Sequence, residues 1–290
     1  MKRISAILLI LALTLLTACG ADRPGDIMES ASAPTAAPQT GTTEQTTAEP
    51  TAEAKPAREV DRSAEEIYKN HPELTPVNYD SPALLPKSDD MGRTYIDRLT
   101  FICDSPTYWL KLYGLLSEGY NTKQIWTGPE GTMTLAYLRD YLIVDPYDGE
   151  LRTIPETAAL REPPMIVIAV GINGISFMDE EYFTAEYEHL IDVLQEASPT
   201  SQILLQSIYP ISPSFHKWGS ITNASITKGN SWILKIAEKY GLPYIDAFSA
   251  LVGEDGNIRP ELVKDDGLHP NADGLVAVLE YLRTHAYVPD

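Results

Sequence analysis

The stretch that decides the fold is Met165-Ile166-Val167-Ile168-Ala169-Val170, an uninterrupted run of apolar residues. A strand that is apolar on both faces is typical of the centre of a parallel sheet, because helices cover such a sheet on both sides. The run ends at Gly171-Ile172-Asn173-Gly174, where small and polar residues set in. We therefore expect residues 165–170 to form a central strand that a loop follows directly.

Strand and helix patterns alternate on both sides of this central strand. Further strands are predicted at residues 99–102, 123–127, 202–208 and 243–246, and helices near Pro106 and at residues 179–197, 221–240 and 272–285. Gly241 is expected to end the helix at 221–240. Five strands alternating with helices predict a doubly wound α/β fold with a mostly parallel sheet. Residues 132–164 fit this pattern least, and there only the turn cluster Asp145-Pro146-Tyr147-Asp148-Gly149 suggests a hairpin.

The N-terminus has the features of a targeting segment. Lys2 and Arg3 precede an apolar run at residues 7–16, which is shorter than a bilayer-spanning helix. The following Leu16-Thr17-Ala18-Cys19-Gly20 resembles the lipobox of bacterial lipoproteins, in which the chain is cut before the cysteine and the thiol is lipidated. This resemblance implies a protein exported from a bacterial cell and anchored in the membrane through Cys19. A plain secretory peptide and an uncleaved anchor are the alternatives.

Composition separates a tether from the domain. Residues 20–62 are rich in Thr, Ala, Pro and Glu with almost no large apolar side chain, so we expect a disordered tether before a single domain at 63–290. Ser63 is predicted to cap the first helix of that domain. The formal net charge of -19 disfavours nucleic acid as a partner, because phosphate binding needs a basic patch. Cys19 and Cys103 are too few for a cysteine-based metal site, and we expect no cofactor.

Polar residues follow the predicted strands and precede the last helix, and ligands of open α/β sheets bind at such strand ends. Ser105 follows the strand at 99–102 and begins a helix, whose free N–H groups favour developing negative charge. A serine nucleophile needs a base, and His269 is the natural one because imidazole titrates near neutral pH. Asp266, three residues earlier, can reach one ring nitrogen in a tight turn while the other faces the serine. The pattern predicts acyl transfer.

The negative oxygen of a tetrahedral intermediate needs hydrogen-bond donors. The candidates are the backbone N–H of Ser105, the side-chain amide of Asn173, and the backbone N–H of a glycine after the second strand, Gly131 or Gly128. Each of these residues alone also fits a helix cap or a turn, as do Asp266 and His269. The four groups in one order favour catalysis over a set of coincidences.

Taken in order, these four blocks resemble those of the SGNH (GDSL-like) hydrolases. The matching blocks are Asp104-Ser105, Gly131-Thr132 (preferred to Gly128), Gly171-Ile172-Asn173 and Asp266-Gly267-Leu268-His269. The resemblance implies a flavodoxin-like, three-layer fold that cleaves esters of lipids, acetylated sugars or other acyl groups without a metal. It assigns catalysis to Ser105, Asp266 and His269, and the oxyanion hole to Ser105, Gly131 and Asn173. Cys103 departs from the pattern, because the family usually has glycine there.

Substrate contacts are predicted from Asp104, from Tyr209 and from Trp218, which lies in a loop at residues 210–219 that could equally be a covering flap. His71, His189, His216 and His285 have no motif around them, so we expect them at the surface or in linkers.

Two functions compete. The leading hypothesis is a lipid-anchored serine esterase that removes acyl groups, acetyl first among them, from extracellular glycans or small esters. The alternative is a catalytically silent surface lipoprotein that keeps the same fold to bind a glycan. A solute-binding lipoprotein would need two lobes, whereas the sequence has one sheet pattern.

Overall fold

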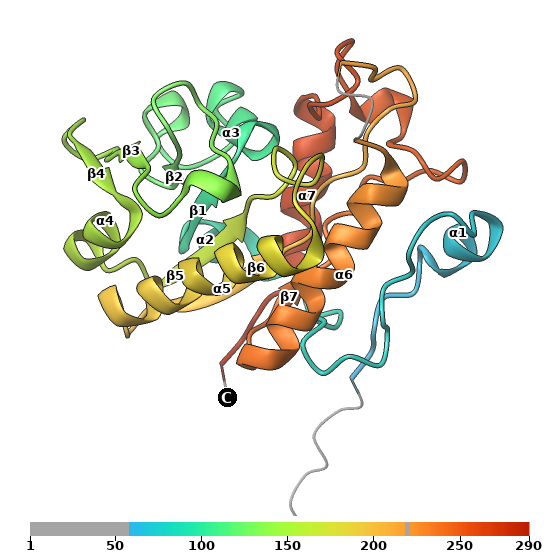
Figure 1. Ribbon diagram of the computed structural model, residues 1–290, viewed down its shortest axis with the longest axis horizontal. Coiled ribbons are helices and arrows are strands. Elements are labelled where there is room, and N and C mark those ends of the chain that lie inside the picture. The colour runs from blue at the N-terminus through green and yellow to red at the C-terminus, as the bar shows by residue number, and fades with distance from the viewer. Residues whose placement is uncertain (1–57, 218–220, 290) are drawn as a thin grey trace, which may run out of the picture. The chain divides into compact units, whose positions relative to one another are not determined.

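The computed structural model describes residues 58–217 and 221–289, so the predicted leader, Cys19 and most of the predicted tether lie outside the described residues. The part from residue 58 onward contains a five-stranded sheet in the order β2-β1-β5-β6-β7, with neighbouring strands parallel (Figure 1). The strands are β1 Leu99–Cys103, β2 Ile125–Trp126, β5 Met165–Ala169, β6 Gln202–Gln206 and β7 Tyr244–Ile245. This is the flavodoxin-like order, and it confirms the predicted central position of the strand that begins at Met165.

Helices cover both faces of this sheet. Figure 1 shows α5 Glu180–Ala197 and α6 Asn223–Tyr240 in front of it, whereas α2 Gly92–Ile96, α3 Ser105–Leu112 and α7 Ala272–Thr284 pack on the other side. Side chains alternate along β5 because successive residues of a strand point to opposite faces. Ile166 and Ile168 therefore join the core under α5 and α6, while Met165 and Val167 join the core under α3 and α7.

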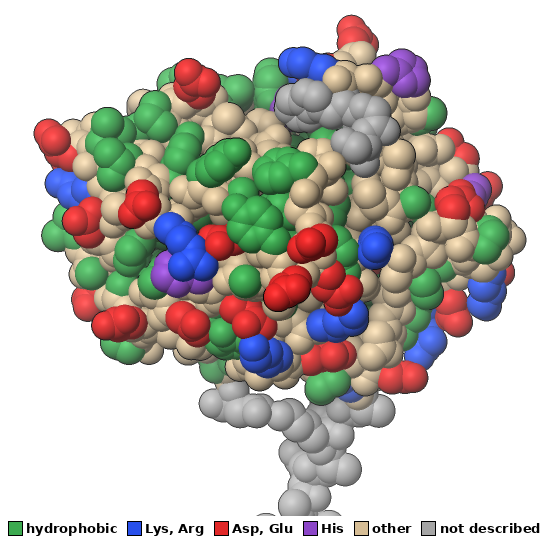
Figure 2. All heavy atoms as spheres, in the orientation of Figure 1, with side chains coloured by type: hydrophobic (Ala, Val, Ile, Leu, Met, Phe, Trp, Pro, Cys, Tyr) green, Lys and Arg blue, Asp and Glu red, His purple; other side chains and the backbone are tan. Residues whose placement is uncertain are grey.

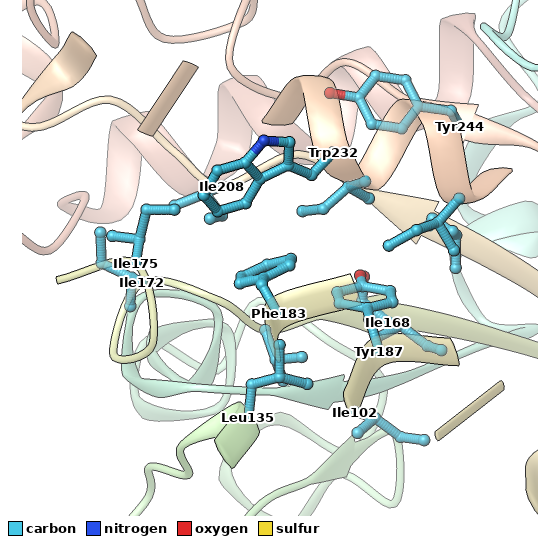
Figure 3. Close-up of a cluster of buried hydrophobic side chains, with 14 of the residues drawn as sticks. Ile102, Leu135, Ile168, Ile172, Ile175, Phe183, Tyr187, Ile208, Trp232 and Tyr244 are labelled. Atoms are coloured by element: carbon cyan, nitrogen blue, oxygen red, sulfur yellow. The ribbon is translucent and has the colours of Figure 1, made fainter. Parts of the chain in front are cut away.

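Aromatic side chains anchor α5 and α6 to the sheet (Figure 3). Phe183 of α5 lies between Tyr187 and Trp232, with ring centroids 5.7 Å and 5.4 Å away. The hydroxyl of Tyr187 donates to the carbonyl of Ile168 at 3.3 Å, so even the buried polar atom of this ring is satisfied by the sheet. Each such fully buried side chain contributes roughly 1.5–3 kcal/mol of transfer free energy, which holds the strand ends in fixed positions.

The segment that the sequence left unassigned contains several short elements. The predicted hairpin is confirmed as β3 Leu142–Val144 paired antiparallel with β4 Leu151–Thr153. Its turn is built on Asp145, which is fully buried and paired with Arg152 and Arg161, both at 2.8 Å. The remaining elements of the described chain are α1 Glu65–Asn70, η1 Gly119–Asn121, η2 Leu135–Tyr137, α4 Ile154–Arg161 and η3 Pro260–Leu262.

Two local predictions were wrong. The first helix begins at Glu65, and Ala64 rather than Ser63 occupies its cap position, without a side-chain cap hydrogen bond. His285 is only 4% exposed, because its ring stacks on Tyr281 with centroids 3.8 Å apart and an interplanar angle of 8°. Tyr281 lies four residues before His285, the spacing at which side chains on a helix become neighbours.

Asp104 joins the ends of the two central strands. It follows β1 directly, and its backbone N–H donates to the carbonyl of Ala169 at the end of β5, 3.3 Å away. Its carboxylate oxygen Oδ2 accepts the backbone N–H groups of Gly171 at 3.0 Å and Ile172 at 3.2 Å. The loops after β1 and β5 are thereby held together at the switch point of the sheet, where ligands of this fold class bind.

This carboxylate is almost completely enclosed, at 4% exposure. Burial raises the pKa of Asp104 to about 7, although the N–H groups of Gly171 and Ile172 oppose the rise. The pKa in the folded state thus exceeds that of the unfolded chain, so folding favours the protonated form. The resulting contribution to stability is full below about pH 4 and is lost as the pH rises through about 7.

We expect Asp104→Asn to remove this pH dependence. The unfolding free energy of the wild type minus that of the variant should fall by roughly 4 kcal/mol between pH 4 and pH 8, since each pH unit of pKa displacement corresponds to about 1.4 kcal/mol. Urea unfolding at several pH values measures this difference, with the exposed Asp273→Asn as the control. A difference that stays constant across this range would contradict the assignment.

Candidate active site

Three side chains from distant parts of the sequence form one hydrogen-bonded chain. His269 Nε2 lies 3.0 Å from Ser105 Oγ, and His269 Nδ1 lies 2.9 Å from Asp266 Oδ2. A carboxylate can only accept, so Nδ1 carries a proton toward Asp266, and in the neutral ring Nε2 is left to accept the hydroxyl proton of Ser105. This is the arrangement in which a histidine acts as general base for a serine nucleophile.

The turn that carries Asp266 and His269 is built around the carboxylate. Oδ1 of Asp266 accepts the backbone N–H groups of Leu268 and His269, each at 2.9 Å. Gly267, directly after Asp266, has φ +73°, a backbone conformation that residues with a Cβ rarely adopt. The Asp-x-x-His spacing therefore places the second carboxylate oxygen next to the ring.

The pKa of Asp266 is shifted in the opposite direction to that of Asp104. Partial burial acts to raise the pKa of Asp266, but the backbone N–H and ring of His269 and the N–H of Leu268 outweigh it and lower the pKa. Asp266 is therefore ionised at neutral pH and can stabilise a protonated His269.

The ring of His269 is positioned from a second side by Trp109 of α3. Their ring centroids are 5.8 Å apart, and the ammonium of Lys264 lies 3.5 Å from the centroid of the Trp109 ring. The side chain of His269 keeps 18% of its surface exposed. Its Nε2 therefore opens toward the cleft while the ring is packed in place.

Ser105 opens onto a cleft of about 690 Å³. Other lining residues are Glu130, Thr132, Thr134, Asn173, Ser214, Phe215, His216, Lys217, Asp266, Leu268 and His269. Most of these residues are polar or charged. The loop at residues 210–219, for which the sequence suggested either a pocket wall or a covering flap, lines the cleft through Ser214, Phe215, His216 and Lys217. No motif marked Ser214 and Lys217 individually.

The predicted oxyanion donors lie in the site, but two of them have their hydrogens engaged. Nδ2 of Asn173 donates to Thr132 Oγ1 at 3.0 Å and to the carbonyl of Met133 at 2.8 Å. The N–H of Gly131 donates to the carbonyl of Gly128 at 2.9 Å, closing a turn. These hydrogens are engaged within the loops, and the oxyanion role of Gly131 and Asn173 stays a prediction. The N–H of Ser105, at the first residue of α3, has no helical acceptor and remains available.

Gly131 and Gly128 are both required by packing. A Cβ on Gly131 would overlap the ring of Tyr108, and one on Gly128 would overlap the hydroxyl of Tyr141 and the carbonyl of Thr132. Gly131 also has φ +72° and is flanked by two cleft residues, Glu130 and Thr132. Gly131 therefore lies between two residues of the cleft wall, and its choice over Gly128 as the oxyanion glycine stays a prediction.

The residues predicted to touch substrate are placed differently. Asp104 and Tyr209 are each 4% exposed, and the hydroxyl of Tyr209 is held by Thr107 at 3.2 Å and Gln206 at 3.1 Å. Both side chains lie beneath the cleft rather than in it, so the prediction that they contact substrate was wrong. Trp218 lies outside the described residues.

Other reactive groups do not assemble a second centre within the described residues. The thiol of Cys103 is fully buried, and burial raises its pKa well above the ordinary value, which disfavours the reactive thiolate. No group of three or more His, Cys, Asp and Glu side chains in residues 58–217 and 221–289 is arranged to hold a metal ion. In the same residues, no helix is both long and apolar enough to cross a membrane.

Comparisons with known proteins give one family and a set of similar folds. A solved GDSL-like lipase from Bacteroides thetaiotaomicron is 17% identical, with 77% of this chain and 96% of that chain covered and a TM-score of 0.45. A carbohydrate esterase of family 3 from Talaromyces cellulolyticus is 15% identical, with 64% and 93% covered and a TM-score of 0.41. The search of curated proteins gives no match. The model of the GDSL-like lipase/acylhydrolase family matches residues 105–275, more than half of the sequence and from the predicted nucleophile to beyond His269, so this chain belongs to the GDSL-like lipase/acylhydrolase family.

Proposed function

We propose that this protein is an exported serine ester hydrolase, anchored through a lipidated Cys19 on the extracytoplasmic side of a bacterial membrane. Its proposed substrates are acetyl or other short acyl esters of extracellular glycans or of small molecules. The observation that carries the proposal is the continuous hydrogen-bonded chain from Asp266 through His269 to Ser105 at the wall of an open cleft. Membership of an acylhydrolase family supports ester bonds as the target.

The geometry supports a two-step mechanism. Ser105 Oγ attacks the acyl carbon while its proton passes to His269 Nε2, and the electron pair of the C=O bond moves onto oxygen. The intermediate then collapses, the alcohol leaves with the proton from His269, and the acyl group remains on Ser105. In the second step His269 removes a proton from water, whose oxygen attacks the acyl carbon and pushes the C=O electron pair onto oxygen. The C=O bond then re-forms, the bond to Ser105 Oγ breaks, His269 returns the proton to Ser105 Oγ, and the acid leaves. Asp266 stabilises the imidazolium formed in both steps.

A glycan as the alcohol part is supported by the surroundings of the cleft. Thr134 lines the cleft, and η2 after it carries Tyr137, which is 66% exposed. Phe177 and Tyr182 are 55% and 41% exposed, and the Tyr182 hydroxyl donates to the carbonyl of Ala136 at 3.3 Å. Figure 2 shows hydrophobic side chains gathered beside the N-terminal end of α5. Exposed aromatic rings of this kind suit the apolar faces of sugar rings.

The catalytically silent alternative is not favoured. A protein that only binds a glycan has no need of a histidine held between a serine and a carboxylate, yet this hydrogen-bonded arrangement is present here. Cys103, which stands in place of the family glycine, lies in the core and leaves Ser105 in contact with His269.

Ser105→Ala should abolish hydrolysis of p-nitrophenyl acetate, because the nucleophile is removed. We expect kcat to fall by at least roughly 10³-fold with an unchanged thermal unfolding transition. Steady-state rates of the domain from residue 58 onward measure this, beside Ser231→Ala, which changes a serine on α6 whose hydroxyl donates to the backbone. Equal rates in Ser105→Ala and the wild type would sink the proposed mechanism and favour a binding protein.

Asp266→Asn tests how His269 is oriented. An asparagine amide facing Nδ1 would force the proton of the neutral ring onto Nε2, so the ring could no longer accept from Ser105. We expect kcat to fall roughly 10²- to 10⁴-fold with little change in KM. The exposed neighbour Asp265→Asn is the matched control. Full activity in Asp266→Asn would show that another group orients the histidine.

A further inference from the structure

Two exposed aromatic residues directly continue the wall of the cleft. Tyr137 is 66% exposed, and its backbone N–H donates to the carbonyl of the cleft residue Thr134 at 3.0 Å. Phe177 is 55% exposed, and its backbone N–H donates at 3.1 Å to the carbonyl of Gly174, which follows the cleft residue Asn173. Each ring therefore belongs to a turn of chain that begins in or beside the cleft.

The segments that carry these rings are fastened to each other. Tyr182, in the first turn of α5, is 41% exposed, and its hydroxyl donates to the carbonyl of Ala136 in η2 at 3.3 Å. A Cβ on Gly174 would lie 3.7 Å from the Cβ of Leu135, so η2 also packs against the loop after β5. We call the three exposed aromatic residues of these segments the aromatic platform: Tyr137, Phe177 and Tyr182.

The aromatic platform is too small for a stable contact between two protein chains. An aromatic residue presents roughly 200 Å² when fully exposed, so the three exposed fractions leave about 300 Å² on the surface. A standard protein interface covers about 800 Å² on each partner, whereas exposed apolar patches of about 300 Å² on a single chain are often functional. Figure 2 shows hydrophobic side chains gathered beside the N-terminal end of α5, with charged side chains around them. The size therefore favours a small or narrow ligand.

The charges around the aromatic platform favour a neutral ligand. The exposed carboxylates of Glu180 and Glu181 come directly before Tyr182 on α5. Arg139, which follows η2, has its guanidinium paired with Glu186 of the same helix at 2.8 Å, so its charge is already compensated. With a formal net charge of -19 on the whole chain, this surface repels anionic membranes and acidic sugars.

From these contacts we infer that the aromatic platform binds the sugar rings of a neutral polysaccharide chain whose ester is hydrolysed at Ser105. The inference rests on the proposed function and names its substrate class. The C–H faces of sugar rings lie on the aromatic faces, while the sugar hydroxyl groups remain in water. The polysaccharide runs from Ser105 past Thr134 and Asn173 onto the platform. Sugars next to the esterified one, rather than the acyl group, therefore supply much of the affinity.

Binding to the Ser105→Ala variant separates the aromatic platform from catalysis. Titration calorimetry with the neutral hexasaccharides of glucose, xylose and N-acetylglucosamine measures Kd. We expect at least one of them to bind, and added Tyr137→Ala or Phe177→Ala to raise its Kd roughly five- to tenfold, because each removes one ring from the contact. The matched control is Tyr147→Ala, which is 54% exposed and lies beside Lys123 at the start of β2, the end of the strand away from the cleft.

Turnover gives a second readout. For the acetylated form of the hexasaccharide that binds, kcat/KM relative to that for p-nitrophenyl acetate should fall roughly tenfold in the Tyr137→Ala, Phe177→Ala double variant, through KM. If the hexasaccharide binds through the platform but no ester is hydrolysed, the proposed function fails while the binding surface stands. The inference is overturned if none of the neutral hexasaccharides binds, if the platform variants bind as tightly as their parent, or if hexagalacturonate binds more tightly. Self-association of the wild type that Tyr137→Ala abolishes would assign this surface to a second copy and also overturn it.

Discussion

The site depends on one buried contact, in which the carboxylate of Asp104 accepts the backbone N–H groups of Gly171 and Ile172. The parallel pairing of β1 with β5 brings the two loops to the same edge of the sheet, and this contact fixes their distance. Ser105 follows Asp104 as the first residue of α3, and Asn173 lies in the loop after β5. A carboxylate that is 4% exposed is costly to ionise, so the fold gives up some stability near neutral pH to hold the site together.

The carboxylates of Asp104 and Asp266 lie in different environments and have different roles. Burial raises the pKa of Asp104, whose partners are backbone groups, and its role is to join strands. Hydrogen bonds lower the pKa of Asp266, whose partners are the backbone and ring of His269, and its role is to keep the histidine oriented and to stabilise its charge. The sequence predicted the role of Asp266 from the Asp-x-x-His motif, but it placed Asp104 among the substrate contacts, because Asp104 lies directly before Ser105.

Most of the fold could be predicted because its determinants are local. The apolar run at Met165 and the alternation of strands and helices specify a doubly wound sheet, and the observed strand order agrees. From the sequence, only the turn of the hairpin at Asp145 could be predicted. The buried carboxylate of Asp145 pairs with Arg152 and Arg161, which lie later in the chain, so the turn residues alone do not indicate this pairing. The contact of Ser105 with His269 follows from an ordered set of motifs rather than from any single one.

The sequence could not predict which way individual side chains point or which acceptors their hydrogens contact. Asn173 was expected to face the oxyanion, yet its amide is engaged by Thr132 and Met133, because a tight loop places those acceptors beside it. Tyr209 follows a strand as a cleft residue would, but it turns into the core, where Thr107 and Gln206 satisfy its hydroxyl. Such orientations depend on contacts between residues far apart in the sequence.

The central claim is that Asp266, His269 and Ser105 form one hydrogen-bonded unit, and proton NMR of the ring N–H of His269 tests it most directly. A proton shared between Nδ1 and a carboxylate is strongly deshielded and protected from exchange. The account predicts one resonance far downfield of the amides that is absent in His269→Ala, displaced in Asp266→Asn and retained in Ser105→Ala. Absence of this resonance from the wild type, or its survival in His269→Ala, would contradict the account.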